Sequence, residues 1–159
     1  MAVPAVETNI QNAKVIAELF RSACSRFPTG ITITTTKGVN GEPHGIYAGS
    51  FISVSLHPPL ILVWIYHKAE ILRSLVLGEC FGVNVLSEPQ RDLSVHSSEN
   101  RLDCFAGTSW HPGITGVPLL FGVPAVFECK TVNMIPAGDH MIIIGRVLHV
   151  VSAEHASLA

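Results

Sequence analysis

Short segments with the two-residue period of a β-strand, joined by tight turns, most constrain the fold of this chain. Residues 31–36 read Ile-Thr-Ile-Thr-Thr-Thr, an alternation that predicts a strand with one face toward solvent. The Asn40-Gly41 pair that follows favours the positive φ angles of a hairpin turn. We therefore expect residues 43–55, interrupted near Gly49, to return as the partner strand of a β-hairpin.

The rest of the chain continues this pattern with few helical segments. Residues 60–66 are apolar at every position, which predicts a central strand buried on both faces. Further strands are predicted at 81–86, 117–121, 123–134 and 140–151, and helices at 9–25, 69–77 and 88–98. The segment from Asn100 to Gly122 reads as a long functional loop. Together these elements predict a mainly β fold, an antiparallel β-barrel with peripheral helices.

Length and composition favour one domain and exclude several classes of protein. A chain of 159 residues is the size of one domain, which we place at 9–151 with terminal segments 1–8 and 152–159. Charged residues make up 14% of the chain, where about 25% is typical, so the surface is sparsely charged. The net charge of −2, without a Lys/Arg cluster, argues against nucleic-acid binding.

Sequence features also argue against a membrane segment and against a metal centre. The longest apolar stretch, 58–66, is far shorter than the roughly 20 residues that span a bilayer. The N-terminus lacks the basic and apolar regions of a signal peptide, so we expect a cytoplasmic protein. The four cysteines have no metal-ligand spacing, and no GxSxG, GxGxxG or P-loop motif occurs.

Three stretches carry residues suited to a ligand site. The stretch 44–56 places small residues and hydroxyls between bulky ones, so backbone amides could approach a flat ligand and serines could bind phosphate. Lys68, ahead of a predicted helix, could meet an anion at the helix start. Ala-Gly-Asp-His at 137–140 lies between two strands. Each has a plainer interpretation, respectively a strand-turn-strand unit, a solvated lysine and a β-turn.

In this order and spacing, the motifs of the chain resemble one known family. They include Phe-Pro-Thr-Gly at 27–30, the 44–56 stretch leading into 57–63, Phe-Gly-Val-Asn-Val-Leu at 81–86, Asp-Cys-Phe-Ala-Gly-Thr-Ser-Trp at 103–110 and Gly-Asp-His at 138–140. They resemble the short-chain flavin reductases, the reductase components of two-component flavin-dependent monooxygenases. The resemblance covers about Phe20 to Val150 and implies the antiparallel FMN-binding split barrel.

The resemblance also implies a site and its ligands. It implies a homodimer that transfers a hydride from NADH or NADPH to FMN or FAD and supplies a monooxygenase. His140 would meet the nicotinamide, and the region from His96 to Ser98 would approach the outer end of the flavin. The cofactor-binding residues implied are Tyr47, Ala48, Gly49, Ser50, Ser53, Ser55, Lys68, Ser98, Gly138, Asp139 and His140.

The chain differs from this family's pattern beside the flavin. Tyr47 and Gly49 stand where family members usually carry a small hydroxyl and an Asn. Tyr47 could then abut the flavin and gate hydride transfer, leaning into the space left by Gly49, or its ring could turn into the core. Two other functions remain open: an enzyme acting on an organic metabolite with Tyr47 or His140 as the proton-transferring group, and a non-catalytic flavin-binding dimer.

Overall fold

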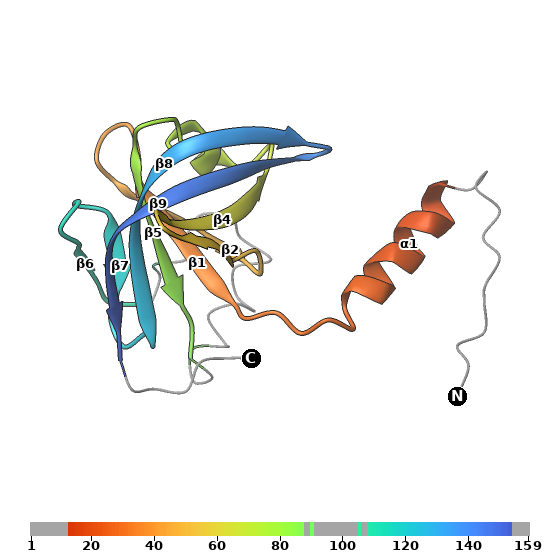
Figure 1. Ribbon diagram of the computed structural model, residues 1–159, viewed down its shortest axis with the longest axis horizontal. Helices are drawn as coiled ribbons and strands as arrows, with labels where there is room; N and C mark the ends of the chain where they lie inside the picture. The colour runs from red at the N-terminus through yellow and green to blue at the C-terminus, as the bar shows by residue number, and fades with distance from the viewer. Residues whose placement is uncertain (1–12, 88–89, 91–104, 106–107, 154–159) are drawn as a thin grey trace.

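The computed structural model describes residues 13–87, 90, 105 and 108–153, and it is dominated by one antiparallel sheet (Figure 1). Seven strands follow the spatial order β2-β1-β5-β8-β9-β4-β3, and β6 pairs with β7 in a separate hairpin. The strands are β1 (Thr32–Lys37), β2 (Pro43–Ala48), β3 (Ile52–Leu56), β4 (Pro59–Tyr66), β5 (Cys80–Val85), β6 (Trp110–Pro112), β7 (Pro118–Leu120), β8 (Ala125–Ala137) and β9 (His140–Ser152). The predicted mainly β, antiparallel architecture is confirmed.

The first hairpin forms, but only over half of its expected return strand, and β1 is buried on both faces rather than exposed on one as predicted. β1 pairs with β2 from Thr32 opposite Ala48 to Lys37 opposite Pro43. After Gly49 the chain leaves β1, and β3 pairs with β4 instead. The predicted single strand 43–55 is therefore two strands near opposite ends of the sheet, because the break at Gly49 redirects the chain.

Ser50 joins the two ends of the strand order. This buried residue lies between β2 and β3, and its hydroxyl both donates to the Trp64 carbonyl oxygen (3.0 Å) and accepts from the Trp64 backbone N–H (3.2 Å). Trp64 belongs to β4, which lies far from β2 in the strand order. The Ser50 hydroxyl therefore stabilises the closure of the sheet into a barrel.

β4 is not buried on both faces, contrary to the prediction from its uninterrupted apolar run. Ile61, Val63 and Ile65 point into the interior, whereas Trp64 on the other face is 38% exposed. The strand lies one position from the edge of the sheet. Apolar residues on both faces of β4 thus indicate an outward apolar surface rather than a central position.

Two apolar clusters lie on the two faces of the sheet. The inner cluster comprises Ile61, Val63, Ile65, Ile71, Leu75, Phe81, Val83, Cys129 and Ile143. The outer cluster comprises Ile33, Leu86, Val117, Leu119, Leu120, Val123 and Val126, and it is covered by the β6–β7 hairpin. β6 lies within the segment predicted as a loop, while β7 falls at the predicted strand 117–121.

Buried polar side chains fasten the β6–β7 hairpin to the sheet. The Asn84 amide donates to the Ile33 carbonyl oxygen (3.1 Å) and accepts from the Leu120 N–H (2.8 Å). A β-carbon at Gly82 would lie 2.5 Å from Thr35 Oγ1 and 3.3 Å from the Pro118 carbonyl oxygen. Close approach of the hairpin to the sheet therefore requires glycine at position 82.

Among the described residues, the helical segments differ from the predicted ones. α1 (Ala13–Cys24) confirms most of the first predicted helix and lies apart from the barrel in Figure 1. The predicted helix 69–77 is wrong: only a 3-10 turn, η1 (Glu70–Arg73), forms, and the N–H groups of Leu72, Ser74 and Leu75 bond to carbonyls three residues back rather than four. The predicted helix 88–98 falls almost entirely outside the described residues. Within the part described, no helix is long and apolar enough to cross a membrane.

Candidate functional site

The carboxyl end of β4 brings together three of the predicted site segments. His140, the first residue of β9, lies opposite Tyr66 in the β4–β9 pairing. Two residues earlier on β4, Trp64 holds the Ser50 hydroxyl. Lys68 follows two residues after Tyr66. The 47–50 stretch, Lys68 and the 138–140 turn therefore converge from sequence positions far apart.

The turn between β8 and β9 presents a hydrogen-bonded acid and imidazole. Gly138 has φ +61°, a left-handed conformation that glycine adopts without a steric penalty. Beyond it, Asp139 Oδ1 lies 2.6 Å from His140 Nδ1. This hydrogen bond lowers the pKa of the Asp139 carboxyl below its ordinary value of 3.8. Asp139 is thus ionised at neutral pH and holds the proton of the imidazole on Nδ1.

Two residues of this site were not predicted from the sequence. The Tyr66 ring lies 5.5 Å from the His140 ring between centroids. His67 binds the turn twice, through its backbone N–H to the Asp139 carbonyl oxygen (3.0 Å) and through Nε2 to the Gly138 carbonyl oxygen (3.1 Å). In the sequence, both residues are marked only by their position at the end of the apolar segment 60–66, which by itself does not indicate a site.

The predicted phosphate-binding residues differ in how free they are to bind a ligand. Ser50 is committed to Trp64, so its hydroxyl serves the fold and only its backbone is left for a ligand. Across the described part of the chain, the hydroxyls of Ser53 and Ser55 and the exposed Lys68 ammonium form no hydrogen bond or ion pair with protein. These three groups can therefore donate to an anionic ligand.

The serines lie far from the imidazole. Ser53 and Ser55 are on β3, opposite Ile61 and Leu60 at the start of β4, whereas His140 is opposite Tyr66. Five to six residues of strand separate the two levels, roughly 17–20 Å at 3.3–3.4 Å per residue. Only an elongated ligand could contact both groups.

Lys68 does not lie at the start of a helix long enough to bind an anion. The predicted helix 69–77 is replaced by the four residues of η1, so its aligned peptide dipoles are few. Any anion binding at this place would depend on the Lys68 ammonium itself.

Tyr47 and Gly49 are not arranged as the sequence suggested. The half-buried Tyr47 side chain packs against the outer cluster. A β-carbon at Gly49 would meet Thr29 Oγ1 at 3.2 Å and, among the described residues, no atom of Tyr47 within 4 Å. The expectation that the Tyr47 ring leans into space left by Gly49 is therefore wrong, because β2 ends at Ala48 and Thr29 borders that space. His96 and Ser98 lie outside the described residues.

The other end of the β8–β9 ribbon has a different character. The hollow there, of about 350 Å³, is bordered by the β6–β7 hairpin and by His111, Phe121, Glu128, His149 and Val151. Burial raises the pKa of the Glu128 carboxyl, but hydrogen bonds from Thr115 and Ile114 outweigh burial and lower it below 4.5. No group of three or more His, Cys, Asp or Glu that could hold a metal occurs within the part of the chain that the structure describes.

The fold and the motifs at this site define a family. The flavin reductase like domain family matches residues 24–159, and the chain belongs to it. The family resemblance seen in the sequence and the split-barrel fold that it implied are confirmed.

Individual relatives give the range of this family. The chain is 43% identical to a protein of Rhizobium meliloti (strain 1021) named "Probable flavin reductase", over 80% of this chain and 41% of that protein. It is 38% identical to the actinorhodin polyketide dimerase of Streptomyces coelicolor, over 81% of this chain and 73% of that protein. The chain spans about half the length of several curated relatives that it matches.

A solved structure supports the fold assignment. The NADH:FAD oxidoreductase SgcE6 of Streptomyces globisporus C-1027, in complex with NAD and FAD fragments, matches with a TM-score of 0.81. The two are 33% identical, and the match covers 94% of this chain and 90% of that chain.

Proposed function

We propose that this protein is an NAD(P)H-dependent flavin reductase that supplies reduced FMN or FAD to a flavin-dependent monooxygenase. The observation that carries the proposal is the convergence of the Asp139–His140 pair, Tyr66 and Lys68 at the end of β4 in a chain of the flavin reductase like family. The protein named as an NADH:FAD oxidoreductase shares this fold over nearly the whole chain.

The residues present fit a flavin. Its phosphate is an anion, and the exposed Lys68 ammonium, which no described residue occupies, offers it a cation. The Ser53 and Ser55 hydroxyls lie near the opposite end of β4, so they could contact only another part of an elongated ligand. The flat ring system of the flavin can approach the backbone closely at Ala48 and Gly49, where side chains are small. When bound, a flavin accepts a hydride from a reduced nicotinamide, which is chemistry that no side chain supplies.

The chain itself contributes binding and orientation. The Asp139 carboxylate fixes the His140 ring, so that its Nε2 is available to a nicotinamide while Nδ1 stays hydrogen-bonded. Tyr66 supplies an aromatic surface beside that ring. Such positioning shortens the distance between the two reacting rings and excludes unproductive arrangements.

Anaerobic reduction of added flavin tests the proposal directly. NADH or NADPH added to catalytic protein with FMN or FAD should bleach the flavin absorption far faster than without protein. Binding below about 100 μM, or about −5.5 kcal/mol, should appear as quenching of flavin fluorescence. Absence of both signals with all four combinations of flavin and nicotinamide would refute the reductase function.

A pair of lysine variants tests the phosphate contact. Lys68→Met should raise the KM for FMN about 2- to 5-fold, as for an exposed ion pair, and leave the KM for riboflavin unchanged. Riboflavin lacks the phosphate, so it isolates the contact. Lys14→Met, on the exposed face of α1, serves as the matched control and should change neither constant.

We also propose that the protein is a homodimer. Large apolar side chains are exposed on α1 (Leu19, Phe20), on β3 (Ile52, Val54, Leu56) and on β9 (Leu148, Val150). Exposed apolar surface of this extent is typical of protein interfaces. Light scattering should give twice the 17.1 kDa mass of the chain, and a 17 kDa particle at micromolar concentration would contradict the dimer. The cytoplasmic location remains a prediction from the sequence.

A second function is kept because one relative supports it. The polyketide dimerase is 38% identical to this chain, close to the identity of relatives named as reductases, such as 39% and 38%. The chain would then act on an organic metabolite, with His140 or Tyr47 moving a proton. Slow oxidation of NADH with free flavin, together with tight retention of flavin, would favour this alternative.

A further inference from the structure

The tip of the β8–β9 ribbon is supported from one side. β5 pairs with β8 only from Ala125 to Lys130, and backbone bonds with Glu79 and Gly78 end at Thr131. Among the described strands, the remainder of β8 up to Ala137 has only β9 as a neighbour, and the ribbon extends beyond the barrel in Figure 1. The place of the turn therefore depends on contacts made from β4.

The β4–β9 ladder reaches to Tyr66 opposite His140, and His67, directly after β4, extends these contacts to the turn itself. Its backbone N–H donates to the Asp139 carbonyl oxygen (3.0 Å), and its ring Nε2 lies 3.1 Å from the Gly138 carbonyl oxygen. Because a carbonyl oxygen only accepts, Nε2 must carry a proton. One residue thus holds the two consecutive carbonyls of the turn that precedes His140.

The turn between β8 and β9 also sets the orientation of the His140 ring. Asp139 Oδ1 lies 2.6 Å from His140 Nδ1, and the two residues are adjacent in the chain. Fixing the backbone of Gly138 and Asp139 restricts where the Asp139 carboxylate lies, and this carboxylate restricts the rotation of the imidazole. His67 and His140 are therefore mechanically linked through two peptide units and one hydrogen bond.

We propose that His67 is a positioning residue for His140, which places the imidazole for the nicotinamide without touching either ring system. The inference rests on the proposed function, since it assumes that His140 acts on the nicotinamide. It adds a residue that no family motif in the sequence pointed to.

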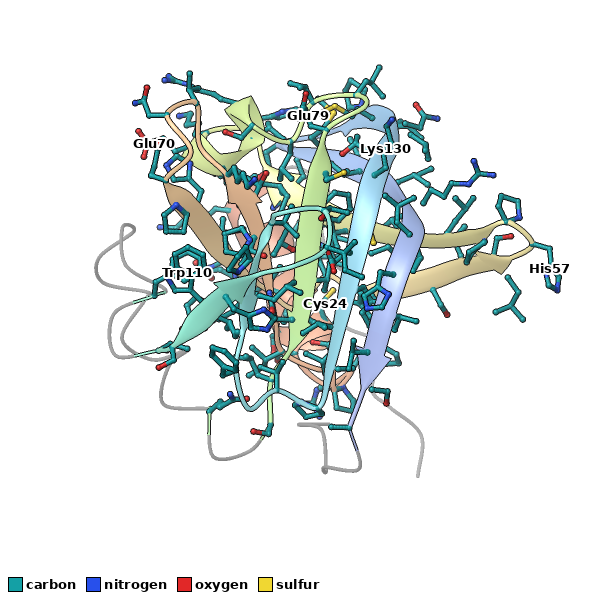
Figure 2. All side chains as sticks on the ribbon, turned by 90° about the vertical axis from the view of Figure 1, so that its left-hand side faces the viewer. Cys24, His57, Glu70, Glu79, Trp110 and Lys130 are labelled. Carbon is teal, nitrogen blue, oxygen red and sulfur yellow. The ribbon has the colours of Figure 1, made fainter. Side chains whose placement is uncertain are left out.

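Single variants of His67 test the inference. His67→Ala removes the ring bond and keeps the backbone bond, so the limiting rate of flavin reduction should fall about 3- to 10-fold, the size of one exposed hydrogen bond. The Kd for flavin should stay within about twofold, because no flavin-binding group has moved. His67→Gln keeps an N–H donor of similar reach and should recover at least half of the lost rate. His57→Gln, at the tip of the β3–β4 hairpin in Figure 2, is the matched control and should not change the rate.

A double-mutant cycle separates the inference from the proposed function. If His67 acts through His140, then His67→Ala should have no further effect in the His140→Ala background. An independent readout is the ¹⁵N NMR spectrum of the His140 ring, whose Nδ1 signal should shift in His67→Ala and return in His67→Gln.

The outcomes distinguish failure of the positioning role of His67 from failure of the proposed role of His140. A slow His140→Ala variant beside a normal His67→Ala variant overturns the positioning role alone. Equal losses from His67→Ala in both backgrounds also overturn it, since His67 would then act independently. If His140→Ala reduces flavin at the rate of the unmodified protein, the proposed role of His140 fails, whereas the NMR shift still reports whether His67 holds the ring.

Discussion

The two ends of the β8–β9 ribbon use polar side chains in opposite ways. At the end under the β6–β7 hairpin, Asn84 and Glu128 are almost fully buried and bonded to backbone groups of the hairpin. At the tip, Asp139 and His140 are exposed or half-buried and bonded to each other. The polar groups at the first end are hydrogen-bonded within the protein, whereas those at the tip remain partly available to a ligand.

This contrast indicates which polar residues of the chain serve its structure. A buried amide or carboxylate with every bond made to protein is costly to remove because its partners lose their bonds in a dry environment. An exposed acid and imidazole contribute little to stability because water competes for them. Substitutions should therefore affect folding at one end of the ribbon and catalysis at the other.

The largest effect is expected at Asn84. Asn84→Ala leaves the Ile33 carbonyl oxygen and the Leu120 N–H without their buried partner, so the free energy of unfolding should fall by about 2–4 kcal/mol. Denaturant titration at one fixed protein concentration measures it. Asn133→Ala, at an exposed position, is the control and should change it by less than about 0.5 kcal/mol. Equal losses in both variants would contradict the structural role of Asn84.

The sequence predicted the sheet better than the site. Alternation at 31–36 and the Asn40-Gly41 turn are local signals, and the β1–β2 hairpin follows them. Only one face of β4 is fully buried. Which face other elements cover depends on the tertiary packing, and a local sequence pattern does not show this. Asn84 lies within a strand, and its partners are 36 and 51 residues away, so its anchoring role could not be predicted from spacing.

The site follows the same division. Gly-Asp-His at 138–140 was singled out through the family resemblance, and its acid and imidazole are neighbours in the chain and in the turn. His67 was missed because the partner of its ring, the Gly138 carbonyl oxygen, lies 71 residues away on another hairpin. Ser50 was predicted as a flavin contact from its motif, but the closure of the barrel occupies its hydroxyl. Long-range hydrogen bonds thus account for most of what the sequence could not show.

The pH dependence of the stability contributed by Glu128 provides a second difference between the two ends of the ribbon. The folded-state pKa of this carboxyl is lowered, so its contribution to stability is complete above the ordinary value of 4.5 and is lost as the pH falls through the lower folded value. Glu128→Gln should therefore be less stable than the unmodified protein by about 1–2 kcal/mol at pH 7. This difference in the free energy of unfolding should become smaller below pH 4.5.

The control for this titration is an exposed acid. Glu79→Gln, at the position labelled in Figure 2, should leave the free energy of unfolding nearly unchanged at both pH values. The difference in the free energy of unfolding between Glu128→Gln and the unmodified protein is expected to shrink toward acid pH. If it stays constant or widens, the hydrogen bonds to Glu128 do not favour its ionised form.

At the tip the expected effect is on rate. His140→Ala should slow flavin reduction by NAD(P)H about 5- to 150-fold, equivalent to about 1–3 kcal/mol, while the Kd for flavin changes little. The free energy of unfolding should stay within about 0.5 kcal/mol, because the His140 ring is partly exposed. A folded variant with unchanged turnover would remove His140 from the site.

The smallest effect is expected from the two positions that differ most from the family pattern. The Tyr47 ring packs against the outer cluster, and the space at Gly49 is bordered by Thr29. Tyr47→Thr combined with Gly49→Asn should then leave the rate of flavin reduction within about twofold, since no positioning contact is removed. Loss of the packed ring should still lower the free energy of unfolding by about 1–2 kcal/mol. A rate that rises tenfold or more in the double variant would instead show that Tyr47 obstructs the nicotinamide, and the single variants would locate the obstruction: Tyr47→Thr alone would reproduce the rise, whereas Gly49→Asn alone would only displace the Thr29 side chain.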